Sequence, residues 1–245
     1  MAEIRWVTAF VDLPAAAFDV GARFWAAVTG WPLSERRGEQ GQFATLLPPA
    51  GDAFLRVQAV GSGGGLHLDL HTDDVAGLAT RAEDLGADVT DRSAQLVLLR
   101  SPGGFRFCVT EHGGETRHPA ATVWPGGRSL PDQVCLDLPA HLADPETAFW
   151  AGLTGWALTP SDSPEFQHLR DPSLPVRLLL QRLGAGDPGQ VVRAHLDLSC
   201  DDVDAEAVRH VGLGATLLDR RPGWTVLRDP AGLVYCATAR VPPGP

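Results

Sequence analysis

The sequence has few cysteines and no long apolar run. Its four cysteines form no CxxC pair, which argues against a disulfide scaffold and favours a reducing cytoplasm. No apolar stretch approaches the roughly 20 residues that span a bilayer. The first ten residues also lack the basic and apolar regions of a secretion signal. These absences predict a soluble cytoplasmic protein.

Basic residues are scarce relative to acidic ones, 20 against 30, and the formal net charge is −10. Proteins that bind nucleic acids need clustered basic side chains to neutralise phosphates. The arginines here are scattered along the chain, so we expect no binding to DNA or RNA. A negative surface most often serves solubility.

The chain contains an internal duplication. ARFWAAVTGW at 22–31 matches TAFWAGLTGW at 147–156, HLDLHTDDV at 67–75 matches HLDLSCDDV at 195–203, and LRSPGGFRFC at 99–108 matches LRDPAGLVYC at 227–236. The matches keep their order, which indicates two copies of one unit. We predict a first module over 1–113, a Gly- and Pro-rich linker over 114–128, and a second module over 129–241.

Each copy shows the same order of expected elements. A strand leads into a helix, two or three strands follow, and the HLDL strand precedes a second helix and two closing strands. We expect Asp144 to cap the first helix of the second copy, and the Asp pairs after HLDL to cap the second helices. Gly30 and Gly155 should end the first helices. Antiparallel strands with helices on one face predict an α+β architecture.

Side chains alternate across a strand, so the HLDL phrases divide into two faces. The leucines should pack beneath the helices, while His67, Asp69 and His71 lie on the other face, with His195 and Asp197 in the second copy. The last strands place Arg106 and Cys108, or Cys236, on that polar face. This face could be solvent-exposed, or it could line an enclosed cleft, which the nearby aromatic residues favour. The two histidines could equally be structural or contact a ligand. Trp25 and Trp150, at matching positions within helices, should belong to the core.

FWAAVTGW and FWAGLTGW, then HLDL-x-x-DDV, LGA and SPGG or DPAG resemble the vicinal oxygen chelate superfamily, which includes glyoxalases, bleomycin-resistance proteins and extradiol dioxygenases. The resemblance covers nearly the whole chain, once per copy. It implies tandem glyoxalase-like modules of paired βαβββ units, whose curved mixed sheets form a half-open barrel. It also implies a monomer in which the two modules form an intramolecular pseudo-dimer.

The resemblance further implies where a metal would bind. The middle ligand position of the family falls on His67 and His195, and the position of its last-strand Glu falls on Cys108 and Cys236. The first-strand position falls near Trp6 to Thr8 and near Pro131 to Gln133, where only Gln133 could coordinate. Because this set is incomplete in both copies, we predict no metal ligands and no cofactor.

These observations lead to a functional prediction of a metal-independent small-molecule-binding protein of the glyoxalase/bleomycin-resistance type, which sequesters an antibiotic or metabolite. An alternative is a metal-dependent or histidine-based lyase, isomerase or dioxygenase of the same superfamily, and a third is a structural protein without a ligand. The residues expected to contact the ligand are His67, Asp69, His71, Arg106, Cys108, His195, Asp197, Trp224, Arg228 and Cys236. No catalytic residue is assigned.

Overall fold

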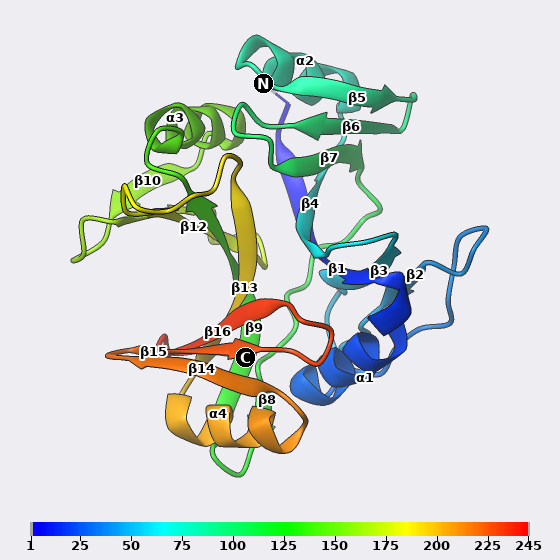
Figure 1. The fold of residues 1–245 in the computed structure, drawn as a ribbon. Coiled ribbons are helices and arrows are strands. Elements are labelled where there is room, and N and C mark those ends of the chain that lie inside the picture. Colours follow the sequence, from blue (N-terminus) through cyan, green and yellow to red (C-terminus); the bar gives the residue numbers. More distant parts are fainter. Residues whose placement is uncertain (1, 245) are drawn as a thin grey trace. The chain divides into compact units, whose positions relative to one another are not determined.

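A computed structural model of the chain describes residues 2–244. The first copy contains strands β1 to β7 and helices α1 and α2 (Figure 1). Their bounds are β1 (Ile4–Pro14), α1 (Phe18–Thr29), β2 (Phe43–Thr45), β3 (Leu55–Val60), β4 (Gly65–Thr72), α2 (Val75–Asp84), β5 (Asp88–Arg92), β6 (Leu96–Arg100) and β7 (Arg106–Glu111), with a short 3-10 turn, η1 (Ala15–Ala17), before α1.

The second copy repeats this order and has one additional strand after its first helix. Its bounds are β9 (Gly127–Leu138), α3 (Ala143–Thr154), β10 (Ala157–Pro160), β11 (Phe166–Arg170), β12 (Arg177–Arg182), β13 (Arg193–Cys200), α4 (Val203–Gly212), β14 (Thr216–Arg221), β15 (Trp224–Arg228) and β16 (Val234–Thr238). A short strand, β8 (Thr122–Trp124), lies in the predicted linker and forms a hairpin with the beginning of β9.

The strands form two curved, mixed sheets that do not close into barrels, which confirms the predicted α+β architecture. One sheet has the order β2-β3-β1-β4-β7-β6-β5, and the other has the order β10-β11-β12-β9-β13-β16-β15-β14. The parallel pairs β4/β7 and β13/β16 join the HLDL strand of each copy to its last strand. Corresponding irregularities follow Val89 in β5 and Leu217 in β14, where the register with the neighbouring strand shifts.

The chain divides into two compact units, and each unit takes residues from both copies. Unit 1 comprises Met1–Ala9, Leu66–Thr116 and Val134–Ala194; unit 2 comprises Phe10–Gly65, Arg117–Gln133 and His195–Pro245. Apart from the beginnings of the two copies, unit 1 therefore joins the second half of copy one to the first half of copy two, and unit 2 joins the remaining halves. The module boundaries that the repeat predicts therefore stay a prediction.

The core of unit 1 forms where α3, from the second copy, packs on β7, from the first. The Phe107 ring lies 5.8 Å from Phe149 and 5.3 Å from Trp150, between centroids. Helix α2 covers β6 and β7 on the same side and packs against α3 (Figure 1). Trp150 is fully buried, as expected for a core residue.

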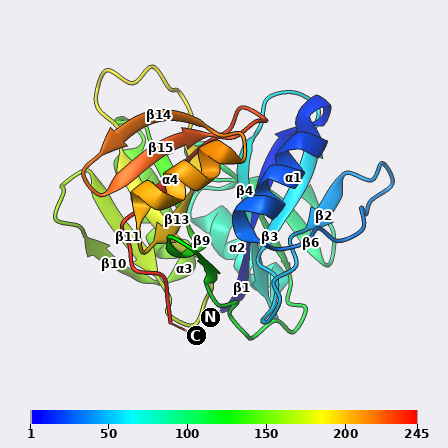
Figure 2. The ribbon, with the colours of Figure 1, turned by 90° about the horizontal axis from the view of Figure 1, so that it is seen from below.

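In unit 2, α1 of the first copy packs on β16 and α4 of the second copy. The Trp25 ring lies 5.1 Å from Tyr235, and Phe24 contacts both Tyr235 and His210 edge-on. Helix α4 lies across β14 and β15 (Figure 2). Both predicted core tryptophans therefore occupy equivalent positions, although each packs on a strand of the other copy.

The helix boundaries follow local sequence signals with one exception. Gly30 and Gly155 end α1 and α3 in the left-handed conformation, with φ of 71° and 68°, as predicted. Asp74 caps α2 and Asp202 caps α4. The prediction for Asp144 is wrong, because α3 begins at Ala143 and Asp144 lies within its first turn, where a negative charge still favours the helix N-terminus.

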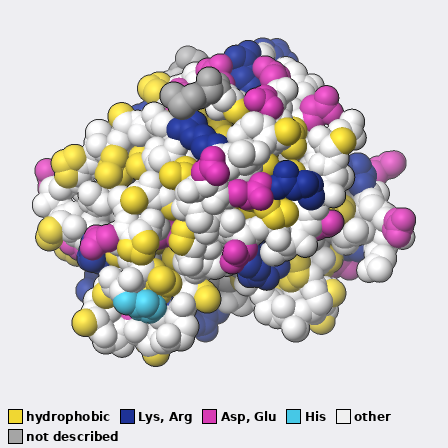
Figure 3. Space-filling view, turned by 90° about the horizontal axis from the view of Figure 1, so that it is seen from above, with side chains coloured by type: hydrophobic (Ala, Val, Ile, Leu, Met, Phe, Trp, Pro, Cys, Tyr) yellow, Lys and Arg dark blue, Asp and Glu magenta, His cyan; other side chains and the backbone are white. Residues whose placement is uncertain are grey.

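The surface carries no extended patch of one charge on the face drawn in Figure 3, where acidic and basic side chains are interspersed with apolar ones. No helix within residues 2–244 is long and apolar enough to cross a membrane.

Candidate metal centre

The polar face of unit 1 is set by the register of β4 and β7. These strands are parallel, and Asp69 lies directly opposite Cys108. Leu68 and Phe107 face the helices and are fully buried. The alternation predicted from the sequence is therefore confirmed, and Asp69 and Cys108 share the face turned away from α2.

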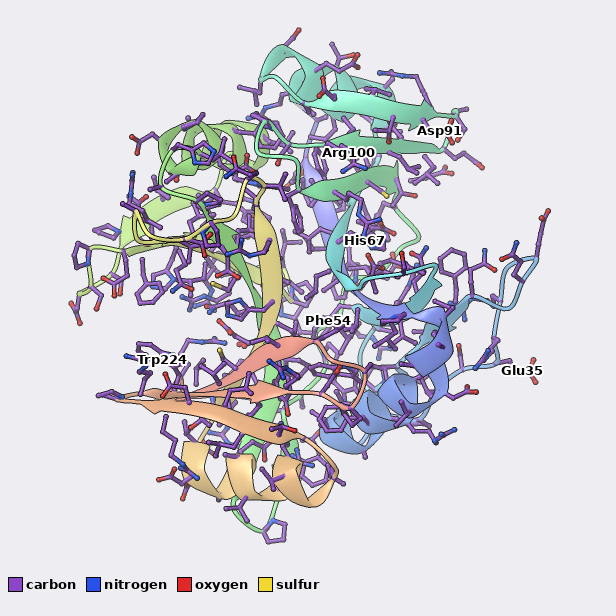
Figure 4. The ribbon with its side chains drawn as sticks, in the orientation of Figure 1. Glu35, Phe54, His67, Asp91, Arg100 and Trp224 are labelled. Atoms are coloured by element: carbon purple, nitrogen blue, oxygen red, sulfur yellow. The ribbon has the colours of Figure 1, made fainter. Side chains whose placement is uncertain are left out.

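Three potential ligand atoms meet on this face. The ligand atoms of His67, Asp69 and Cys108 all lie within 4.8 Å of one another. His67 Nε2 is 3.9 Å from Asp69 Oδ1. Figure 4 shows His67 on β4. Ligand atoms held at 2.0–2.3 Å by one tetrahedral ion lie roughly 3–4 Å apart, so small side-chain rotations bring this group to metal-binding geometry.

Among these three residues, Asp69 gives the strongest indication of a metal site. Its side chain is buried, and its Oδ1 atom has no hydrogen-bond partner within residues 2–244. A buried carboxylate oxygen without a partner is costly, because burial removes its hydration and nothing replaces it. The burial of Asp69 also argues against a polar face that is simply open to solvent.

His71, the third polar residue of the strand, lies away from this group. Its Nε2 atom is 2.9 Å from Thr8 Oγ1, and its side chain is buried. Thr8 lies in the stretch from Trp6 to Thr8 on which the resemblance places the first-strand ligand position. In the first copy, the Thr8 hydroxyl at this place therefore contacts His71.

Unit 2 has a related group with a different third member. His195 Nε2 lies 3.3 Å from Asp197 Oδ1. Gln133 donates a hydrogen bond from Nε2 to Asp197 Oδ2, which leaves Asp197 Oδ1 and Gln133 Oε1 buried without hydrogen-bond partners in the described part of the chain. Both copies thus bury an aspartate with one unsatisfied oxygen beside the HLDL histidine.

The remaining predicted ligand residues of unit 2 lie on the same face of its sheet. Cys236 is opposite Asp197 across β13 and β16, and is buried. Trp224 and Arg228 are on β15, where they alternate with Thr225 and Leu227, which are buried. Trp224 is half-buried and Arg228 is exposed. That these side chains contact a ligand stays a prediction.

Gln133 was not among the residues predicted to contact the ligand, but the structure places it against Asp197 in a buried pair. The signal was present in the repeat, since Gln133 and Thr8 occupy matching positions in the two copies. Their proximity to the HLDL strand depends on the register between strands, which the repeat alone does not determine.

The fold is shared with several solved structures. The Mn(II)-bound glyoxalase from Novosphingobium aromaticivorans superposes with a TM-score of 0.71 at 19% identity, covering 97% of this chain and 83% of that one. A mutant of 4-hydroxymandelate synthase from Streptomyces coelicolor gives 0.64 at 17% identity, covering 99% and 93%. The 2,2',3-trihydroxybiphenyl 1,2-dioxygenase from Sphingomonas wittichii strain RW1 gives 0.63 at 14%, covering 100% and 92%. A comparison with curated proteins found no match.

The prediction of no cofactor is wrong. It assumed that one histidine and one cysteine per copy leave a site short of ligands. The structure adds Asp69 to the first group, and in the second it brings Asp197 to His195 and Gln133 to Asp197. A similar structure, that of the Novosphingobium glyoxalase, contains Mn(II). The prediction considered only three positions of the family and assigned Asp69 and Asp197 to contact with an organic ligand.

A family model described as a glyoxalase-like domain matches residues 8–110 and again residues 133–238. Together these segments cover most of the 245 residues, and they coincide with the two copies of the repeat. The resemblance to the vicinal oxygen chelate superfamily is therefore confirmed, and the chain belongs to the glyoxalase-like domain family, whose domain it carries twice.

Proposed function

We propose that the protein is a divalent-metal-dependent enzyme that acts on a small molecule with two adjacent oxygen atoms. The observation that carries this proposal is the pair of buried, unsatisfied carboxylate oxygens, Asp69 Oδ1 and Asp197 Oδ1, each beside a histidine Nε2. A cation bound at either position would replace the hydration that burial removed.

The donor sets fit such an ion. In unit 1, a histidine nitrogen, a carboxylate oxygen and a thiol sulfur, from His67, Asp69 and Cys108, would hold the metal. In unit 2, the ligands would be His195, Asp197 and Gln133, a nitrogen and oxygen set that suits Mn²⁺ or Fe²⁺. Three protein ligands leave open positions, and the bound ion would act there as a Lewis acid on a ligand oxygen.

The protein residues have distinct functions in this proposal. Gln133 holds Asp197 through its amide nitrogen and so orients the other carboxylate oxygen towards His195. Trp224 and Arg228 in unit 2, and Arg106 in unit 1, would contact the organic part of the ligand. The proposal includes a cytoplasmic monomer with a small-molecule substrate as its only partner.

Metal titration tests the proposal directly. Metal-depleted protein would be titrated with MnCl₂, and free Mn²⁺ would be followed by electron paramagnetic resonance. We expect stoichiometric binding, and a loss of affinity of at least about tenfold when Asp69→Asn or Asp197→Asn removes the charge at its site. Asp73→Asn, which changes an exposed carboxylate just beyond β4, serves as the control and should bind as the unaltered protein does.

The absence of stoichiometric Mn²⁺, Fe²⁺ or Zn²⁺ binding at micromolar concentration would contradict the proposal. Equal binding by Asp69→Asn, Asp197→Asn and the unaltered protein would contradict the assigned ligands. For activity, catechol offers two adjacent oxygens, and oxygen uptake by the metal-loaded protein would distinguish ring-cleaving chemistry from binding or isomerisation.

A further inference from the structure

Two arginines face each other on the polar face of unit 1. Strands β6 and β7 are antiparallel, and Arg100 lies directly opposite Arg106. Both are exposed, whereas the residues that alternate with them, Leu99 and Phe107 among them, are buried towards the helices. The two guanidinium groups therefore project from the same face as Asp69 and Cys108.

Like charges directly opposite on neighbouring strands destabilise a sheet. The pair is unexpected in a chain with a net charge of −10, in which all 20 basic residues are arginines. Arg100 forms no ion pair with any residue of the described chain. Asp88 lies across from it on β5 but forms no salt bridge with it either. The positive charge of Arg100 is therefore not compensated by an ion pair in the described chain, and it lies beside the positive charge of Arg106.

The register continues this row to the candidate metal centre. Because Leu68 lies opposite Phe107 in the parallel pair, the preceding residues, His67 and Arg106, are also opposite each other. The row across β4, β7 and β6 is therefore His67, Arg106 and Arg100. With strands about 4.8 Å apart, Arg100 begins about 10 Å from His67. Figure 4 shows His67 on β4 and Arg100 on β6.

We infer that Arg100 and Arg106 form a subsite for an anionic group, a carboxylate or a phosphate, on the molecule bound at His67, Asp69 and Cys108. Guanidinium groups present paired donors that match the oxygens of such anions. An anion between the two arginines would compensate the charge of Arg100, which forms no ion pair in the described chain. This inference rests on the proposed function for the identity of the ligand, and it deepens that function by naming a charged substrate class.

The second copy supplies a natural contrast. Arg228 corresponds to Arg100 in the repeat, but Val234 occupies the position opposite it. Unit 2 thus has one arginine where unit 1 has two. The subsite is therefore specific to unit 1. Arg92→Gln, which changes an exposed arginine of β5 that pairs with Glu83, is the control for Arg100→Gln.

The first experiment needs no metal, so its outcome is independent of the proposed function. Inorganic phosphate would be titrated into metal-free protein by calorimetry at constant ionic strength. We expect binding that weakens about tenfold in Arg100→Gln and is unchanged in Arg92→Gln. The melting temperature of Arg100→Gln without phosphate should stay unchanged, because Arg100 is exposed and forms no ion pair in the described chain. Absent phosphate binding, or binding indifferent to Arg100, overturns the inference.

The second experiment uses Mn²⁺-loaded protein and compares catechol with 3,4-dihydroxybenzoate, which adds only a carboxylate. The unaltered protein should bind the carboxylate about tenfold more tightly, and Arg100→Gln should reduce that preference to within twofold. Equal binding of the two compounds by the unaltered protein counts against the subsite. If Mn²⁺ itself does not bind, the proposed function fails while the phosphate titration still decides the subsite.

Discussion

In both compact units a helix of one copy places a tryptophan against the last strand of the other, and a buried carboxylate accepts a hydrogen bond from the indole. In unit 2 this carboxylate is Asp229, in the turn before β16; it accepts from Trp25 Nε1 and from the backbone of Ala231 and Leu233. In unit 1 it is Glu146, on α3 itself, which accepts from Trp150 Nε1 and from the backbone of Gly103 in the turn.

In both units a carboxylate therefore links the indole to the turn before the last strand. The turn supplies it in unit 2, and the helix supplies it in unit 1. The residue of unit 1 that corresponds to Asp229 is Ser101, and the residue of unit 2 that corresponds to Glu146 is Gly21. A Cβ atom at Gly21 would lie 2.6 Å from Leu13 Cδ2, so unit 2 has no room for a glutamate on its helix. Each unit thus has one carboxylate for its indole, carried by the turn in unit 2 and by the helix in unit 1.

The units differ more strongly beneath their second helices. In unit 2, Glu206 accepts from Arg209, and its Oε1 lies 3.0 Å from His210 Nε2, while His210 Nδ1 lies 3.0 Å from the Tyr235 hydroxyl. The corresponding residues of unit 1 are Leu78, Arg81, Ala82 and Phe107. Unit 1 thus has an apolar core where unit 2 has a polar network.

Breaking that network should have the largest effect. Glu206→Gln leaves His210 and Arg209 without the charge that compensates their burial. We expect the free energy of unfolding to fall by about 4 kcal/mol. Chemical denaturation would measure it. Glu83→Gln removes an exposed ion pair between Glu83 on α2 and Arg92 on β5. It should change the free energy of unfolding by less than about 0.5 kcal/mol. Equal losses for both substitutions would contradict the comparison.

Acid should weaken unit 2 before unit 1. Burial raises the pKa of Glu206, but hydrogen bonds from Arg209 and His210 outweigh it and lower that pKa to about 2. Burial lowers the pKa of His210, against the opposing effect of Glu206. Both pKa values are below those of the unfolded chain, so their stabilisation is lost as pH falls below 6.5 for His210 and from about 4.5 towards 2 for Glu206.

The loss in that window should reach about 3 kcal/mol for Glu206. Burial raises the pKa of Glu146 in unit 1, so that group stabilises the fold more in acid than at neutral pH. Burial likewise raises the pKa of Asp229, which offsets part of the loss in unit 2. Hydrogen exchange at pH 7 and pH 4 would compare the units. Earlier loss of protection in β6 and β7 than in β15 and β16 would reverse the expected order.

The two indole acceptors allow a finer test. Asp229→Ser removes the carboxylate that accepts from the Trp25 indole and from two backbone N–H groups of the turn. Glu146→Ala removes the carboxylate that accepts from the Trp150 indole and from one backbone N–H group of the turn. We expect each to reduce the free energy of unfolding by about 2 kcal/mol. Indole fluorescence during denaturation would follow both tryptophans. A loss confined to one of the two would show that the two carboxylates are not equivalent.

The helix caps should give the smallest difference. Asp202 accepts from the backbone of Asp204 and Ala205, whereas Asp74 accepts only from Gly77. Asp202→Ala should therefore cost about 1 kcal/mol and Asp74→Ala somewhat less. Thermal melting of the two variants would rank them. The reverse order would mean that the number of accepted hydrogen bonds does not govern cap strength here.

Much of the fold was predictable from the sequence because its signals are local. Strand faces follow from alternation, Gly30 and Gly155 end helices through their own backbone freedom, and Asp74 and Asp202 cap within three residues. The packing of Trp150 on the first copy was not predictable, since the repeat is equally consistent with packing inside one copy. The pairing of Asp197 with Gln133 was missed for a related reason, because it depends on strand register.

The polar network of unit 2 was also missed, although its signal was present. Glu206 and His210 are four residues apart on one helix, a spacing that brings side chains together. Their burial depends on Tyr235 and on α1, which lie far away in sequence. Sequence reasoning identified the strands of the candidate site, whereas the partners of each side chain required the structure.

The exchange of halves between the copies has a consequence for inheritance. Similar stretches such as FWAAVTGW and FWAGLTGW invite recombination between the repeats, which would delete one copy. The shortened chain would retain α1 of the first copy and β13 to β16 of the second, which already pack together in unit 2. Such a chain could therefore bury Trp25 against Tyr235 without a second chain. Because the halves are exchanged between the copies, a deletion of one repeat length would leave behind elements that are partners in the present molecule.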